Sequence, residues 1–79
     1  MTLYRYEVTS LDHLPWLSIG DPVTVDATPM VRLTSGVVVP AVGFRESLAD
    51  ARRDAADKLE LMLQRVQERI GSLRNGVEP

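Results

Sequence analysis

Cysteine is absent from the 79 residues, and aromatic residues make up only 5% of them. Without thiols, neither a disulfide framework nor a thiolate zinc site can stabilise the chain. A domain of this length buries only about 60–65% of the surface that its unfolded chain exposes, so its own core gives a small margin of stability. We therefore expect a partner subunit to contribute to the fold.

Long apolar runs and an excess of positive charge are also missing. No segment approaches the roughly 18 consecutive apolar residues of a membrane helix, and the first residues, MTLYRYEVTS, lack the pattern of a secretory signal. The net charge is −2, whereas nucleic-acid-binding domains usually carry a basic excess. The sequence predicts a cytoplasmic protein, in its own cell or in a host cell.

Residues that carry chemistry are sparse. His13 is the only histidine, and it stands beside Asp12 with no cysteine or serine constellation around it. Asp50, Asp54 and Asp57 share one helical face, but no loop supplies the further oxygens that calcium requires. The phosphate-binding loop pattern is absent. We expect no catalytic residue, no metal and no cofactor; an enzyme would need a site shared between subunits around His13.

Alternating apolar and polar residues predict strands in the first half of the chain. A small antiparallel sheet of three to four strands is expected, with strands at about 2–9, 23–27, 30–34 and 37–42. Ser35-Gly36 predicts a tight hairpin turn, and Pro40 places its strand at an edge or a bulge. Residues 10–22 are interpreted as a connection because Pro15 and the Gly20-Asp21-Pro22 triplet are typical of turns.

The apolar period changes after Ser47. Apolar residues fall at 48, 51, 55, 59, 62, 66, 70 and 73, with spacings of 3 and 4 that predict one long helix over about 47–70 packed on one face of the sheet. Ser47 is the predicted N-cap and Gly71 the predicted stop. Residues 1–71 are thus expected to form a single α+β domain, with a flexible tail at 72–79.

The predicted helix is too long for its own sheet. At 1.5 Å per residue it measures about 36 Å, whereas a compact chain of this size has a radius of gyration near 12 Å. Its first half is rich in alanine and its second half in bulky side chains. We expect a second copy, antiparallel, to cover the second half, with a dimer interface formed by Leu59, Met62, Leu63, Val66 and Ile70. The alternative is a monomer whose LPWLSI segment (14–19) covers this stripe.

Three features predict a second binding surface. The connection at 10–22 carries five large apolar residues, among them Trp16 and Leu17, which either cap the core or meet a partner. Arg52 falls about 20° from the centre of the apolar stripe, and Arg53 follows it. Leu61 lies about 200° from Leu59, on the charged face. The candidate partner-binding residues are therefore Trp16, Leu17, Arg52, Arg53 and Leu61, although a snorkelling Arg52 and a single exposed leucine are ordinary features too.

These patterns favour a small non-enzymatic protein-binding module, an adaptor or an inhibitor, that acts as a homodimer. Phage or mobile-element proteins that block a host protein complex are of this size and style. The alternative function is a nucleic-acid-associated accessory protein that uses surface arginines, namely Arg5, Arg32, Arg45, Arg52 and Arg53. Filter binding at low and high salt separates the two, because phosphate contacts give a steep salt dependence.

Overall fold

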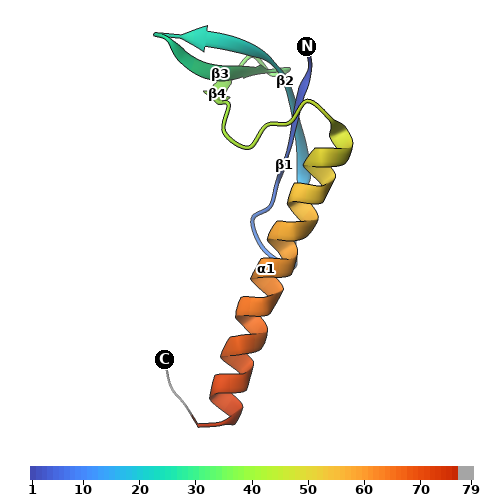
Figure 1. Ribbon diagram of the computed structural model, residues 1–79, viewed down its shortest axis with the longest axis vertical. Coiled ribbons are helices and arrows are strands. Elements are labelled where there is room, and N and C mark those ends of the chain that lie inside the picture. Colours follow the sequence, from blue (N-terminus) through green and yellow to red (C-terminus); the bar gives the residue numbers. More distant parts are fainter. Residues whose placement is uncertain (77–79) are drawn as a thin grey trace.

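A four-stranded antiparallel sheet followed by one C-terminal helix forms the protein (Figure 1). The computed structural model describes residues 1–76. The strands are β1 (Leu3–Glu7), β2 (Trp16–Val25), β3 (Thr28–Leu33) and β4 (Val38–Pro40), and the helix is α1 (Leu48–Arg74). Each strand pairs with the next along the chain, in the order β1-β2-β3-β4. The predicted α+β class, with its sheet followed by one long helix, is confirmed.

The prediction of a connection over residues 10–22 is wrong in its second half. β2 begins at Trp16 and runs through Gly20, Asp21 and Pro22 without a break. Its first half pairs with β1, from Glu7↔Trp16 to Leu3↔Gly20, and its second half pairs with β3, from Gly20↔Leu33 to Val25↔Thr28. Pro22 pairs with Val31 of β3, but the hydrogen bond from Thr34 N–H to the Ile19 carbonyl sets an alternation in which the Pro22 nitrogen faces away from β3. That nitrogen faces the side where β1 has already ended, so its missing N–H deprives no neighbouring strand of a hydrogen bond.

Gly20 is the residue at which β2 changes neighbours, and it has no room for a side chain. A Cβ atom built there would lie 2.4 Å from the Arg32 carbonyl oxygen and 2.6 Å from Val31 Cγ1. Val31 is fully buried at this crossing. A glycine is therefore required at this position for β2 to pair with both β1 and β3. The sequence had suggested instead that Gly20, followed by Asp21 and Pro22, belongs to a turn between strands.

Two tight turns join the last three strands. The predicted Ser35-Gly36 turn is present: Gly36 has φ +93°, and Leu33 N–H donates to the Val37 carbonyl at 2.8 Å. The β2–β3 turn lies at Asp26-Ala27, inside the strand predicted over 23–27, and both residues have positive φ, 50° and 62°. Positive φ at both central positions is the geometry of a two-residue hairpin loop, which favours Asn-Gly or Asp-Gly. Ala27 is therefore strained.

Replacing Ala27 with glycine is expected to stabilise the protein by about 1 kcal/mol, because glycine adopts positive φ without the Cβ clash. The midpoint of thermal unfolding, measured by circular dichroism at fixed protein concentration, should rise by a few degrees. Ala49→Gly is the matched control: it makes the same chemical change at an exposed helical position and should lower the midpoint instead. A fall in both variants would contradict the strained turn.

The helix begins as predicted and ends later than predicted. The Ser47 side chain accepts a hydrogen bond from the Asp50 backbone N–H at 3.3 Å, as an N-cap does. Gly71 does not stop α1, since one internal glycine costs only about 1 kcal/mol; the helix continues to Arg74, and Asn75 is its C-cap. Within the predicted flexible tail 72–79, residues 72–74 are therefore helical, and residues 77–79 lie outside the described part of the chain.

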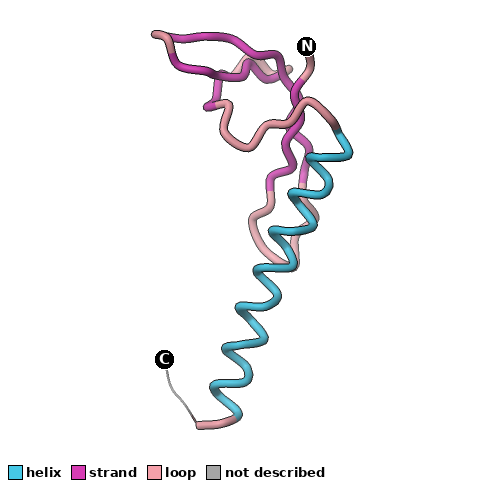
Figure 2. The backbone as a smooth tube through the Cα atoms, viewed as in Figure 1, coloured by secondary structure: helices cyan, strands magenta, loops and turns pink. Residues whose placement is uncertain are grey.

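The core is small and lies at one end of an elongated molecule. The N-terminal half of α1 packs against β1, where Ala51 and Ala55 are buried. Among residues 1–76, the only other buried apolar side chains are those of Val8 and Val31. The C-terminal half of α1 extends past the sheet (Figures 1 and 2). The radius of gyration is 16.7 Å, compared with about 12 Å for a compact chain of this length.

Candidate protein-interaction surfaces

The folded chain exposes more surface than a compact monomer of its mass. Its accessible surface is 5957 Å² at 8.8 kDa, whereas a globular monomer of that mass exposes about 4,800 Å². The difference of about 1,200 Å² is larger than the share that one protein contributes to a standard protein–protein interface, about 800 Å². Much of the exposed apolar area lies in two regions, the C-terminal half of α1 and the start of β2.

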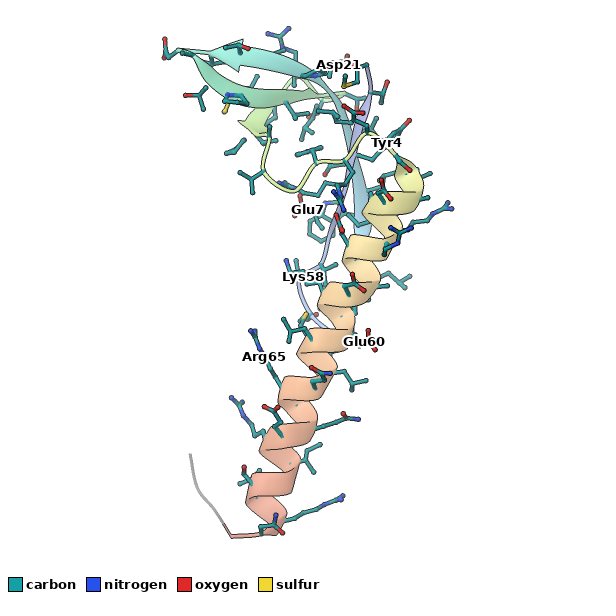
Figure 3. All side chains as sticks on the ribbon, viewed as in Figure 1. Tyr4, Glu7, Asp21, Lys58, Glu60 and Arg65 are labelled. Carbon is teal, nitrogen blue, oxygen red and sulfur yellow. The ribbon has the colours of Figure 1, made fainter. Side chains whose placement is uncertain are left out.

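The C-terminal half of α1 presents a row of aliphatic side chains to solvent. Leu63, Val66, Ile70 and Leu73 are each exposed by 42–55%, and Leu59 and Met62 are half-buried nearer the sheet. Figure 3 shows the charged side chains of Glu60 and Arg65 projecting from this part of the helix in different directions. Nothing in residues 1–76 covers Val66 and Ile70, so the helix presents an amphipathic face without an intramolecular partner.

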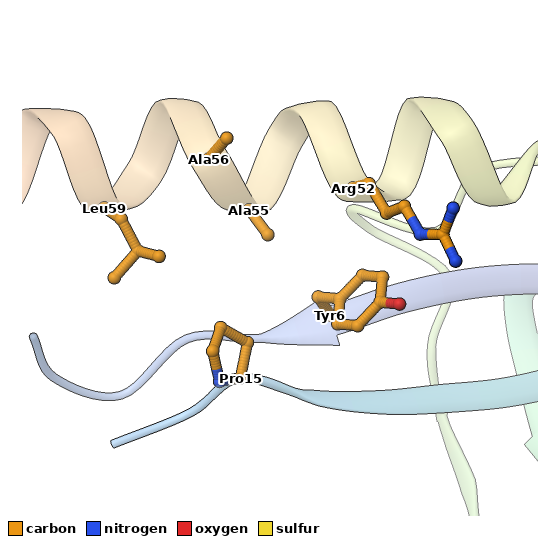
Figure 4. Close-up of a pocket in the computed structure, with 6 residues that line it drawn as sticks. All are labelled: Tyr6, Pro15, Arg52, Ala55, Ala56 and Leu59. Carbon is orange, nitrogen blue, oxygen red and sulfur yellow. The ribbon is translucent and has the colours of Figure 1, made fainter. Parts of the chain in front are cut away.

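An apolar hollow lies where this row meets the sheet. It measures about 240 Å³ and is lined by Tyr6, Pro15, Arg52, Ala55, Ala56 and Leu59 (Figure 4). The hollow exists because the helix presents two alanines at this level, and the β1–β2 connection, represented by Pro15, closes only one side. Sequence reasoning missed this hollow because its walls come from three separate segments of the chain. The signal available in the sequence was the alanine pair in the middle of an otherwise bulky stripe.

The start of β2 forms the second exposed region. Leu14 is 91% exposed and Trp16 is 54% exposed. The interpretation of Trp16 as a core-capping side chain is therefore wrong. The segment does not cover the C-terminal stripe of α1 either, which removes the lid arrangement that the sequence left open. Leu11, exposed by 43% in the same connection, extends this region.

Leu17 does not share the exposed face of Trp16. Directly opposed residues of an antiparallel pair point to the same side of the sheet. Leu17 pairs with Tyr6, which lines the hollow beside α1, and Trp16 pairs with Glu7 on the other side. The structure thus separates two residues that the sequence grouped together: Leu17 is half-buried on the helix side, and Trp16 is exposed away from it.

Arg52, Arg53 and Leu61 are all exposed but do not form one surface with Trp16. Arg52 lines the hollow, is exposed, and has no carboxylate within ion-pairing distance among residues 1–76. Arg53 lies 3.4 Å from Asp50, one helical turn away. Leu61 is 46% exposed on the charged face, directed away from both apolar regions.

Most of the arginines proposed for nucleic-acid contact are engaged with carboxylates. Arg5 pairs with Glu7 and lies 4.5 Å from the centre of the Phe44 ring. The Arg45 Nε atom lies 2.8 Å from Asp54 Oδ2. Arg53 is the third of these arginines with a carboxylate partner, Asp50. A carboxylate beside an arginine offsets the positive charge that would otherwise attract a nucleic-acid phosphate. This arrangement weighs against a continuous basic surface formed by these arginines.

The only histidine lies in the exposed β1–β2 connection. Its Nδ1 atom is 2.7 Å from Ser10 Oγ and 3.6 Å from Asp12 Oδ1. A nucleophilic triad needs the serine at one ring nitrogen and the acid at the other, but here both approach Nδ1. The side chains of His13 and Asp12 are 72% and 83% exposed, so no enclosed site surrounds them. These three residues resemble a solvated turn rather than a reaction centre.

Neither a metal centre nor a membrane span is found in the part of the chain that the structure describes. Residues 1–76 contain no group of three His, Cys, Asp or Glu side chains arranged to hold a metal ion. α1 is long, but it is too polar to cross a bilayer. Comparison of the chain with protein-family models, with curated proteins and with solved structures gave no significant match.

Proposed function

We propose that this protein is a small non-enzymatic protein-binding module, an adaptor or an inhibitor, that acts as a homodimer. The observation that supports it best is the surplus of exposed apolar surface, which lies in two separate regions at different places in the fold. Proteins expose such surface where they meet other proteins. We include in the proposal an origin in a phage or mobile element and a role in blocking a host complex.

The two regions have different roles in this proposal. The C-terminal half of α1 is aliphatic and continuous with the protein's own small core, so it serves self-association. The region around Leu11, Leu14 and Trp16 is directed elsewhere and contains the only tryptophan. Tryptophan is enriched among the residues that contribute most to binding energy. We assign this second region to a partner protein.

Substitution of Trp16 tests the partner-binding role. Trp16→Ser should leave the fold intact, because the side chain is 54% exposed, and should weaken binding of the partner about 30-fold, the effect of losing about 2 kcal/mol at a binding hot spot. Val42→Ser is the matched control, since Val42 is 81% exposed outside both regions. Candidate partner proteins are captured from a bacterial lysate with the wild-type protein. Each purified candidate is then titrated against the wild type, Trp16→Ser and Val42→Ser to measure its affinity for each form.

The proposal requires a protein that binds the wild type and Val42→Ser with equal affinity and binds Trp16→Ser much more weakly. If every captured protein bound all three forms equally, the region around Trp16 would have no role in recognition. If no protein were captured while the fold stayed intact, the protein-binding function itself would be contradicted.

A further inference from the structure

α1 carries a second set of aligned positions besides those that face its own sheet. The residues buried against β1, Ala51 and Ala55, lie on one side of the apolar stripe. On the other side, six residues follow one another at spacings of 3, 4, 3, 4 and 3: Ala56, Leu59, Leu63, Val66, Ile70 and Leu73. This is the 3.5-residue period of a coiled-coil seam, with Ala56, Leu63 and Ile70 at its a positions and Leu59, Val66 and Leu73 at its d positions. We refer to these six residues as the seam.

Resting on the homodimer of the proposed function, we infer that two copies pair antiparallel along this seam, each inserting the C-terminal end of α1 into the hollow of the other. In an antiparallel coiled coil the a and d positions of opposite helices share a layer. Pairing Leu63 with the partner copy's Val66 then sets Leu59 opposite Ile70 and Ala56 opposite Leu73. Every layer is apolar, and Arg52 lies outside the paired layers.

The open hollow supports the antiparallel arrangement because the chain carries both this hollow and bulky exposed side chains suited to fill it. At one end of the seam, Ala56 lies at the rim of the open hollow of about 240 Å³, whose other walls include Tyr6 and Pro15. At the other end, Ile70 and Leu73 are bulky and exposed by 42% and 55%. Interiors pack densely when large side chains face small ones. A two-fold antiparallel pair achieves this twice, once at each end.

A parallel pair would not place large side chains opposite small ones at the ends of the seam. It would set Ala56 opposite Ala56 and leave the hollows of both copies empty. It would also bring Arg69 of each copy near Arg74 of the other, because g and e positions meet across a parallel seam. Like charges at such positions are unfavourable.

A second copy also accounts for the exposed area better than an unrelated helix does. The surplus of about 1,200 Å² per chain, relative to a compact monomer, is shared between the seam and the region around Trp16. About 800 Å² of it per chain at the seam would give about 1,600 Å² for the pair, the size of a standard interface. The described part of the chain has a single fully buried large side chain, Val31, so it needs this cover whenever it is folded. Another copy is the one partner always present at the protein's own concentration.

Engineered cysteines test the register cleanly, since the natural sequence has none. Two single variants, Ala56→Cys and Leu73→Cys, are oxidised separately and as a mixture, then separated by mass without reducing agent. These positions lie about 25 Å apart along one helix at 1.5 Å per residue, so in this register neither variant can cross-link to itself. The mixture should give a disulfide-linked species of twice the monomer mass, because the two positions share a layer within the reach of a disulfide.

A second pair, Leu59→Cys with Ile70→Cys, should behave in the same way, and mixtures with Leu61→Cys should not cross-link because Leu61 lies outside the seam. Circular dichroism confirms that each variant is helical. Cross-linking of Ala56→Cys or Leu73→Cys alone would establish a parallel pair and overturn the inference. A dimer by light scattering in which neither mixture cross-links would overturn this register while leaving the proposed homodimer and its partner binding intact. A monomer would overturn the inference and the homodimer, but not the role assigned to Trp16.

Discussion

The double substitution Leu63→Asp with Val66→Asp is expected to abolish the dimer. Both residues lie at the middle of the proposed interface, and both are exposed in the single chain, by 46% and 42%. In one copy the new carboxylates would be solvated, whereas in the pair four of them would be enclosed without partners, at several kcal/mol for each charge. We expect dimer affinity to fall at least about 1,000-fold, or about 4 kcal/mol. Light scattering should report a monomer, either folded with reduced stability or unfolded.

Leu61→Asp is the control for this substitution. Leu61 is exposed by 46%, as Leu63 is, and it lies on the same helix within one turn, but its side chain is on the charged face. The variant should retain both the mass and the unfolding midpoint of the wild type. Equal effects of the two changes would mean that added charge on α1, rather than burial of the seam, governs association. If Leu61→Asp lost partner binding without unfolding, Leu61 would be a recognition residue.

Gly20→Ala is expected to destabilise the monomer fold severely. The added methyl group would meet the Arg32 backbone at 2.4 Å and Val31 Cγ1 at 2.6 Å, and backbone atoms in the middle of a sheet cannot move aside cheaply. Overpacking of this kind costs about 3 kcal/mol, which is a large share of the stability of a domain this small. Urea denaturation followed by circular dichroism should show a much lower midpoint or no folded baseline.

Gly71→Ala is the matched control, since no atom lies within 4 Å of a Cβ added there. Alanine is the better helix former by about 1 kcal/mol, so this variant should be as stable as the wild type or more stable. A Gly20→Ala protein with a normal unfolding midpoint would contradict the close crossing of β2 and β3.

The helix was predictable because its signal is long and redundant. Eight apolar positions at helical spacing agree with one another, and Ser47 caps the start as expected. The first strand was predictable for a similar reason, with three aromatic or β-branched residues in alternation. The exposed stripe on the second half of α1 was predictable from length alone, because the predicted helix is longer than a sheet of short strands can cover.

The start of β2 was not predictable from local signals. Gly20 and Pro22 usually mark turns, and only the tertiary arrangement explains both: Gly20 because β1 and β3 converge on it, and Pro22 because β1 has already ended there. Conversely, Ala27 gives no turn signal, although it adopts the positive φ that a turn requires. The hollow was hidden because its lining comes from β1, the β1–β2 connection and α1.

The molar mass of the wild-type protein in solution, measured by light scattering over a dilution series, tests the central claim most directly. If another copy covers the α1 seam, the molar mass at the higher concentrations should be twice 8.8 kDa. The helix content should fall only at the dilutions where the dimer dissociates. A well-folded species of 8.8 kDa at every concentration, with α1 intact, would contradict it.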